Sequence, residues 1–422
     1  MFEIGLDISS NKISAVECFK TNKGIFIKNA GIIDIEPHAV ANGELVDSIV
    51  LVDGLKNLWK NFKFQKKEVN LGLSNTKLVI KEIELPVTED KEIENAINYQ
   101  IEDYFPIAKE NLVFDYYVIE KKSGSSKVMI IGALKNMINN YIEAVQSAGL
   151  IINSIDLNCF AFYRAASYVN NFKNLKLSES GKNVCLVYFG QEVSIVEFAD
   201  ENELRYPRFM NISINNYIEN LGHKTNASNE ELLSIIKEFD FEKLLIKETK
   251  KKAELLSIQK ESFGETVPEE NKIPESYVQP GEDSKEAVEE NIKTGPDSFE
   301  TSVSVTESGI HGVEEVDLTE IRDSLKISAN QLVNEISRSI DHFLQENRDF
   351  KVEKILISGE KLINMDKYIE KNSKLPVERI DISKMIQSDL FKKNTAIKTD
   401  DLSDIGNRLI ISTGLALRGI KQ

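Results

Sequence analysis

The segment GLDISSNKIS places an acidic residue at the end of an apolar stretch and a polar turn after it. Asp7 is the acidic residue, Ser9, Ser10 and Asn11 form the turn, and Lys12 follows directly. Hydroxyl and backbone N–H groups in such a turn can bind phosphate oxygens, and an aspartate at a strand end can orient the water shell of a Mg2+ ion. The pattern predicts either a nucleotide-phosphate site or a plain β-hairpin, and the residues alone leave both open.

Strands and helices around this turn follow from the spacing of apolar residues between polar turns. In the first half we expect strands at 2–8, 13–19, 24–35, 69–73, 77–85, 112–120, 127–133 and 151–157. The helices expected there lie at 46–62, 89–104 and 160–168, with a further one that follows the strand at 127–133 and ends at 148. In the second half we expect strands at 183–189, 193–199, 204–209 and 354–358, and helices at 318–345, 361–372 and within 408–420. Each half opens with a strand, a polar turn and a strand, which predicts an internal duplication.

A segment near the middle of the second half has a different composition from its surroundings. Residues 261–315 are rich in Glu, Ser and Pro and hold fifteen acidic residues against three lysines, so they carry most of the net charge of −16. With few large apolar side chains to bury, this segment is expected to be a disordered tether, with an acidic docking strip as the alternative.

The length of 422 residues favours two lobes over a single core, and a composition of 41% hydrophobic and 28% charged residues fits a soluble globular chain. The acidic balance argues against a nucleic-acid binder. Cys18, Cys159 and Cys185 lie far apart in apolar stretches, as buried free thiols in a reducing compartment would. The four histidines lack metal-ligand spacing, and no signal peptide or apolar run of about 18 residues is present, so we expect a cytoplasmic protein.

Three separated stretches resemble the actin-like ATPase superfamily, and in particular its PilM family of type IV pilus assembly proteins. They are GLDISSNKISAVE, then IEPHAVANGELVDSIVLVDGLKNLW, and then VIKEIELP followed by YQIEDYFPIAKENLVFDYYV and YIEAVQSAGLIINSIDLNCFAFYRAA. The likeness continues in NEISRSIDHF, ILISGEKLINMDKYIE and ISTGLALRG. It implies an α/β, actin-like fold, in which a ribonuclease H-like unit is duplicated into two lobes, with a small inserted α/β subdomain.

The expected domain boundaries follow from this resemblance and the composition. The parts are the first lobe at 1–85 and 151–180, the inserted subdomain at 86–150, the second lobe at 181–260 and 316–422, and the acidic insertion at 261–315.

The resemblance also implies a site for ATP and Mg2+ between the lobes, in which Asp7 faces the metal and no residue is assigned a catalytic role. The implied residues are those of the first hairpin, Asp7, Ser9, Ser10, Asn11 and Lys12; of the second hairpin, Gly190, Gln191 and Ser194; of the adenosine turn, Ser358, Gly359 and Glu360; and Arg338 beside the ribose or base. The alternative for Arg338 is an ordinary surface arginine.

Four positions depart from the family pattern. Ser9 replaces a glycine whose missing Cβ leaves room for phosphate, and Glu360 replaces the second glycine of the adenosine turn. Tyr188 and Asn158 stand where carboxylates are usual. Since hydrolysis requires an oriented water and a compensated γ-phosphate, we expect slow or absent ATPase activity, and the extra charge of Glu360 weakens nucleotide binding as well.

The resemblance implies a scaffold at the inner face of the cell membrane, which binds the N-terminal cytoplasmic tail of a PilN-like single-span membrane protein, other pilus assembly components and possible further copies of itself. The tail is expected in a groove between the first lobe and the inserted subdomain. Residues 78–120 offer strands and an apolar helix face for it, unless these side chains fill the subdomain core; the helix residues are Ile93, Ile97, Ile101, Tyr104 and Phe105.

Two other classes of protein stay open at this point. An FtsA-like division protein shares the inserted subdomain, but it usually ends in an amphipathic membrane helix, whereas here the sequence stops directly after the last expected helix. An active ATPase, of the sugar kinase or chaperone type, would need a carboxylate at the position of Tyr188.

Overall fold

The computed structural model describes residues 2–36, 39–170, 183–200, 204–225, 227–245, 318–386 and 406–420. The acidic insertion expected at 261–315 lies outside these residues. Residues 171–182 and 246–260, which belong to the expected lobes, lie outside them as well. No helix in the described ranges combines the length and the apolar character that a bilayer crossing needs.

The first sheet contains five strands in the order β10-β6-β1-β2-β3. Their bounds are β1 Phe2–Ile8, β2 Lys12–Thr21, β3 Gly24–Asp34, β6 Glu68–Leu73 and β10 Ile151–Leu157. Strands β1, β2 and β3 pair antiparallel with one another, whereas β6 runs parallel to both β1 and β10. Helix α1 (Ser48–Phe62) covers one face of this sheet and is capped at its N-terminus by Asp47, whose side chain accepts hydrogen bonds from the N–H groups of Ile49 and Val50.

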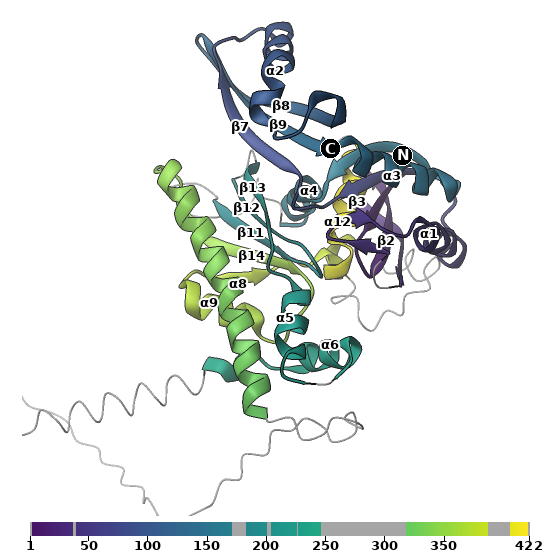
Figure 1. Cartoon of the computed structure of the whole chain (residues 1–422), viewed down its shortest axis with the longest axis vertical. Helices are drawn as coiled ribbons and strands as arrows, with labels where there is room; N and C mark the ends of the chain where they lie inside the picture. Colours follow the sequence, from purple (N-terminus) through teal and green to yellow (C-terminus); the bar gives the residue numbers. More distant parts are fainter. Residues whose placement is uncertain are drawn as a thin grey trace, which may run out of the picture. The chain divides into compact units, whose positions relative to one another are not determined.

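The second sheet has the order β13-β12-β11-β14-β15, which repeats the first when that sheet is read from β3 to β10 (Figure 1). Strands β13, β12 and β11 pair antiparallel, and β14 and β15 continue the sheet in parallel to β11. Its strands are β11 Val184–Phe189, β12 Ser194–Ala199, β13 Leu204–Met210, β14 Lys354–Gly359 and β15 Val377–Arg379. Its helices are α5 Ile214–Gly222, α6 Asn229–Glu238, α8 Leu318–Glu346 and α9 Met365–Ser373. The identical strand order in both sheets confirms the duplicated two-lobed fold expected from the sequence.

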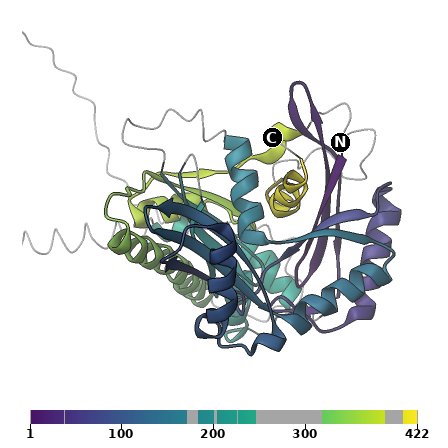
Figure 2. The ribbon, with the colours of Figure 1, turned by 90° about the horizontal axis from the view of Figure 1, so that it is seen from above.

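Two helices fill the space between the sheets. Helix α12 (Ile410–Arg418) packs against β1, β2, β6 and α4 (Asn158–Asn170), and α4 packs against β12 and β13 (Figure 2). The approach of α12 to β1 requires Gly5, because a Cβ there would lie 1.9 Å from the carbonyl oxygen of Ser412. One apolar cluster therefore includes side chains of both sheets, and the two lobes share part of their core. The three cysteines are buried free thiols, as expected.

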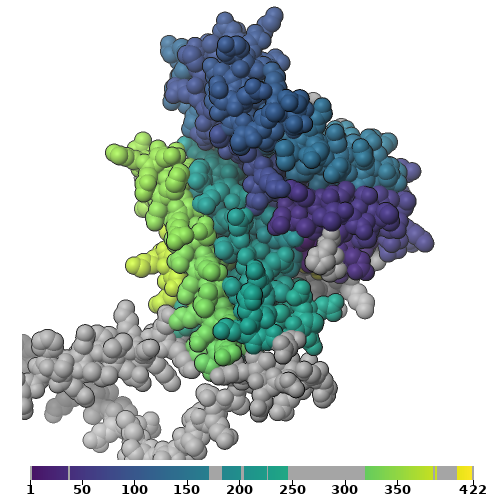
Figure 3. All heavy atoms as spheres, in the orientation of Figure 1, coloured from purple at the N-terminus to yellow at the C-terminus, as the bar shows by residue number. Residues whose placement is uncertain are grey.

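The inserted subdomain is a three-stranded antiparallel sheet in the order β7-β9-β8, with a helix on one face. Its elements are β7 Val79–Leu85, α2 Asp90–Tyr104, the short η1 Lys109–Asn111, β8 Leu112–Lys122 and β9 Ser125–Leu134, followed by α3 Lys135–Ser147. Figure 3 shows the surface of its residues in blue. Further short elements are the pair β4 (Val40–Ala41) and β5 (Glu44–Leu45), and η3 (Ile382–Met385).

The apolar face of α2 is buried against this sheet, so it does not line a groove. Ile93, Ile97, Ile101 and Phe105 are each at most 2% exposed and form the subdomain core with strand residues. Tyr104 packs at the edge of the same cluster. Of the two alternatives that the sequence left open, the structure therefore shows packing of the subdomain core, because a three-stranded sheet needs a helix face to cover its apolar side.

Candidate functional site

The first hairpin has the tight geometry of an ordinary two-stranded turn. Asp7 lies opposite Ser14, and Ile8 lies opposite Ile13. The backbone N–H of Ser9 donates to the Lys12 carbonyl oxygen at 2.9 Å, and the Ser9 hydroxyl donates to the same oxygen at 3.1 Å. The Ser9 hydroxyl is therefore engaged within the turn, and the first charged side chain after it is that of Lys12.

Asp7 is buried at the carboxyl end of β1, with 4% of its surface exposed. Its Oδ1 accepts a hydrogen bond of 2.9 Å from Nδ2 of Asn158, the first residue of α4. Burial raises the pKa of the Asp7 carboxyl, and the Lys12 charge and the Asn158 hydrogen bond offset part of this rise. A cation bound beside the carboxyl would lower this pKa and favour the ionised form that a metal or its water requires.

The second hairpin is bound mainly to its own lobe. The backbone N–H of Gly190 donates to the hydroxyl of Ser194 at 3.1 Å, and the Gly190 carbonyl oxygen accepts the N–H of Ile214 at 3.1 Å. The side chain of Gln191 donates through Nε2 to Oδ1 of Asn215 at 2.8 Å. Both Ile214 and Asn215 lie at the start of α5, so this helix fixes the second turn.

The adenosine turn expected at residues 358–360 ends strand β14. Gly359 has a φ of +101° and its Cβ would lie 2.1 Å from the Phe189 carbonyl oxygen, so this position requires glycine. The hydroxyl of Ser358 contacts Oδ1 of Asn407 at 3.1 Å. The N–H of Glu360 donates to the Phe189 carbonyl oxygen at 2.7 Å, which joins this turn to the end of β11.

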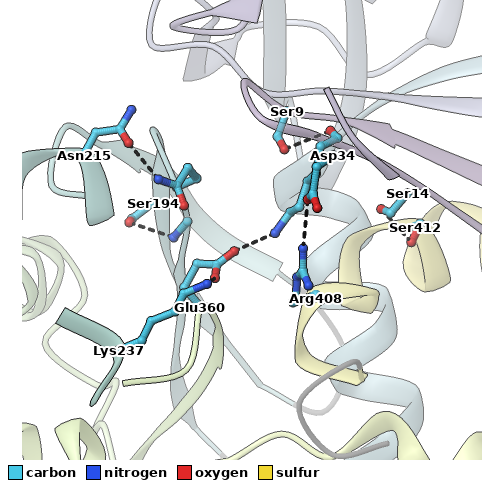
Figure 4. A network of polar contacts seen from close by, with 12 residues as sticks. Ser9, Ser14, Asp34, Ser194, Asn215, Lys237, Glu360, Arg408 and Ser412 are labelled. Atoms are coloured by element: carbon cyan, nitrogen blue, oxygen red, sulfur yellow. Dashed lines mark hydrogen bonds and ion pairs between the residues drawn. The ribbon is translucent and has the colours of Figure 1, made fainter. Parts of the chain in front are cut away.

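An ion pair connects the two lobes at this point. Nζ of Lys12, in the first sheet, lies 2.6 Å from Oε1 of Glu360, which directly follows a strand of the second sheet (Figure 4). The two side chains are only 3% and 5% exposed. Lys237 of α6 lies 3.7 Å from the other oxygen of Glu360. Residues that are 348 positions apart in the sequence thus meet in a buried contact between the first hairpin and the turn after β14.

Tyr188 lies beside this ion pair, on the face of β11 that is turned toward the first lobe. Burial raises the pKa of its hydroxyl, and the charges of Asp7 and Glu360 raise it further. Its ring packs 5.7 Å from the ring of Phe162 in α4, measured between centroids. An aromatic ring therefore lies near both acidic groups, at the position where the resemblance implies a carboxylate.

The first hairpin fits a phosphate group in part. Oγ of Ser10 and Oδ1 of Asn11 are buried and lack a hydrogen-bond partner among the described residues, and so does Oδ1 of Asn158. A free hydroxyl can donate to a phosphate oxygen, whereas the two amide oxygens suit metal-bound water. The positive charge of Lys12, however, is already neutralised by Glu360. The residues present would hold a phosphate and its hydrated Mg2+ only if Lys12 changed its partner.

The observed contact of Arg338 is with its own helix and not with the residues of the two hairpins. Its side chain is 75% exposed and pairs with Glu335 of the same helix, α8, at 3.2 Å. No hydrogen bond or ion pair within the described part of the chain connects it to either hairpin. Sequence reasoning also missed Lys237, Asn407 and Arg408, of which Arg408 pairs with Asp34 at 3.5 Å; a charged residue just before an apolar helix was the available signal for Arg408.

The repeated sheet order, with α4 and α12 between the sheets and one hairpin from each lobe at their junction, defines an actin-like fold. A solved structure described as a PilM-PilN type IV pilus biogenesis complex shows the same fold, with a TM-score of 0.71 and 16% identity, over 100% of this chain and 99% of that chain. EutJ from Carboxydothermus hydrogenoformans (TM-score 0.47, 10% identity, 99% of this chain and 90% of that one) and MreB5 of Spiroplasma citri bound to AMPPNP (0.47, 11%, 99% and 96%) are more distant.

A family model for the type IV pilus assembly protein PilM matches residues 5–238, which is more than half of the chain. The protein belongs to the PilM family. No curated protein sequence matches it.

Proposed function

We propose that this protein is a cytoplasmic scaffold of the type IV pilus assembly machinery, held at the inner face of the membrane by the N-terminal tail of a PilN-like membrane protein. The observation that carries this proposal is the agreement in fold, over the whole chain, with the structure of a PilM-PilN complex. Membership of the PilM family supports the same role. Other pilus assembly components are further candidate partners.

A scaffold rather than an efficient ATPase is favoured by the side chains at the lobe junction. The charge of Lys12 is paired with Glu360 and is therefore not free to bind a phosphate. Tyr188 and Asn158 are buried there, and neither provides a carboxylate to orient an attacking water. ATP with Mg2+ would be held by Asp7 and the first hairpin, and we propose weak binding with slow or no hydrolysis. Phosphate release by the purified protein, at multiple turnovers and enzymatic rates, would overturn this part of the proposal.

The tail is proposed to bind on the face of the subdomain sheet opposite α2. On this face, Ile131 and Ala133 of β9 contact the core of the first lobe, so the face begins where the subdomain and the lobe meet. Tyr117, opposite Met129 in the sheet register, continues it and is 64% exposed, and Val113 on the same side of β8 is 38% exposed. This strip also contains Asp115, which is exposed between Val113 and Tyr117, and such a mixed strip that starts at the junction can receive an extended peptide.

The charge of the subdomain indicates what kind of peptide would bind. Residues 79–134 contain eleven acidic residues and six lysines, so the surroundings of the strip attract a basic tail. We therefore propose a short tail that combines basic residues with apolar ones.

A peptide-binding measurement tests this proposal. A peptide with the sequence of a PilN-like N-terminal cytoplasmic tail would be labelled, and its affinity for the full-length protein measured by fluorescence anisotropy. Tyr117→Ala should weaken binding about tenfold, since an exposed aromatic at a peptide site is a typical anchor. Tyr99→Ala is the matched control, because Tyr99 is 90% exposed on α2 of the same subdomain. Equal losses in both variants, or none in either, would exclude this face.

A further inference from the structure

The buried ion pair between Lys12 and Glu360 is held from both ends by the backbone. The Lys12 carbonyl oxygen accepts two hydrogen bonds from Ser9, and the Glu360 N–H donates to the carbonyl oxygen of Phe189. Gly359 adopts its positive φ directly before Glu360 and cannot be replaced by a residue with a Cβ without a backbone collision. The two side chains therefore meet through fixed main-chain positions rather than through a chance surface contact.

The pair also satisfies a strict electrostatic requirement. A buried lysine is unfavourable unless a negative group lies against it, and Lys12 has 3% of its side chain exposed. Burial alone would raise the pKa of Glu360, but the charge and hydrogen bond of Lys12, with Lys237 and Arg408, lower it to about 2. Glu360 is thus ionised at neutral pH, and its carboxylate gives Lys12 the negative partner that a phosphate would otherwise supply.

We propose that Glu360 determines the specificity of the lobe junction: its carboxylate replaces a nucleotide phosphate as the partner of Lys12, so that the two lobes are joined without nucleotide. This inference rests on the proposed phosphate-binding role of the first hairpin. A triphosphate reaches Lys12 only by displacing Glu360, and it then meets the repulsion of that carboxylate. The junction is consequently stable when empty and selects against polyanionic nucleotides.

The test compares the affinity for Mg2+·ATP of the full-length protein with that of Glu360→Gln. Glutamine keeps the size of the side chain but removes the charge, so we expect affinity to rise about tenfold or more, as measured by isothermal titration calorimetry. Lys12→Met in the same background should abolish this gain. The matched control is Glu378→Gln, which removes the carboxylate partner, at 2.8 Å, of another buried lysine, Lys354, in the same lobe.

The role of the pair in joining the lobes is measured separately, without nucleotide. Lys12→Met and Glu360→Gln should each lower the urea midpoint of unfolding, and the double variant should lose less than the sum of the two, because neither partner is then left unpaired. If Glu360→Gln alone is poorly folded, the urea midpoint of the double variant is compared with that of Lys12→Met. A double variant that is at least as stable as Lys12→Met then supports the coupling of the two side chains.

Two results would overturn the inference. One is a folded Glu360→Gln protein that binds Mg2+·ATP no more tightly than the wild type, and the other is strict additivity of the two substitutions in urea. Binding of the tail peptide, measured on the same samples, reports on the proposed scaffold function independently. If the wild type does not bind the tail peptide, the proposed scaffold function is refuted, but the inference about Glu360 is not.

Discussion

Glu197 provides the sharpest test of how the lobes are packed. It lies in β12 with 0% exposure, and neither of its carboxylate oxygens has a hydrogen-bond partner among the described residues. It is opposite Leu186, and with Ile195 and Ala199 it faces the core shared by the two lobes. Burial raises its pKa well above the ordinary value of 4.5. A carboxyl group is thus enclosed in apolar surroundings without compensation.

Replacement of Glu197 by leucine should stabilise the protein. An unsatisfied buried polar group costs about 1–3 kcal/mol, and leucine has nearly the same volume. A pH dependence adds to this gain. Because the folded pKa is raised, the wild type bears no ionisation penalty below pH 4.5, the unfolded value, and a penalty that grows as the pH rises above it. The difference between variant and wild type should increase by about 1.4 kcal/mol per pH unit in that window.

The assay is urea unfolding of both proteins between pH 5 and pH 8. Glu17→Leu is the matched control, because Glu17 is also a buried glutamate, in the corresponding second strand of the first sheet, but it pairs with Lys28 at 3.0 Å. That variant leaves Lys28 without its carboxylate partner, although its Nζ still lies 4.4 Å from the centroid of the Phe2 ring, and should be destabilised by about 1 kcal/mol. Parallel pH curves for Glu197→Leu and the wild type, or a loss of stability in the variant, would refute the reasoning about the buried carboxyl.

Two further predictions concern the hairpins. Gly359→Ala should lower the free energy of unfolding by about 2 kcal/mol, measured in urea, because alanine tolerates neither the positive φ nor the contact with Phe189; an unchanged midpoint would contradict the strained turn. Ser10→Ala should not lower stability and should raise it slightly, since the buried Ser10 hydroxyl has no partner in the described residues, yet it should weaken Mg2+·ATP binding about tenfold if that hydroxyl meets a phosphate. Calorimetry with Ser14→Ala as a neighbouring control checks this.

The two sheets were largely predictable because their strands are short, apolar and separated by polar turns. The first strand, Phe2–Ile8, and the tenth, Ile151–Leu157, agree with the expected bounds to the residue. The repeat of strand, turn and strand in the second half also indicated the duplication. Pairing partners such as β11 and β14, however, lie far apart in the sequence, and only the family resemblance pointed to their order.

The missed elements are short or depend on their neighbours. Helix α6 was overlooked although Ser228 and Glu231 form a capping box, in which the Ser228 N–H donates to Glu231 at 2.8 Å. Strand β15 has three residues and exists because it pairs with β14. Helix α2 was found, but its buried face was also offered as a groove, since periodicity shows that a face is apolar and not which partner covers it.

Contacts at the candidate site were the least predictable, because they join residues across the whole chain. Spacing could identify the hairpin after Asp7, but no local pattern relates Lys12 to Glu360. The role of Arg338 in nucleotide binding stays a prediction, since its observed partner is Glu335 on its own helix.

The departures from the family pattern act together once the structure is considered. Asn158, where the resemblance implies a carboxylate, donates a hydrogen bond of 2.9 Å to Asp7. Glu360, where the resemblance implies a glycine, neutralises Lys12, and the ring of Tyr188 lies within the field of both acidic groups. If each substitution were a separate loss, buried charges would be left without partners and stability would fall. Instead, Asn158 and Glu360 each bond to a residue of the first hairpin, whereas Tyr188 packs against Phe162 of α4. We infer that in the proposed scaffold these internal contacts take the place of contacts with a ligand.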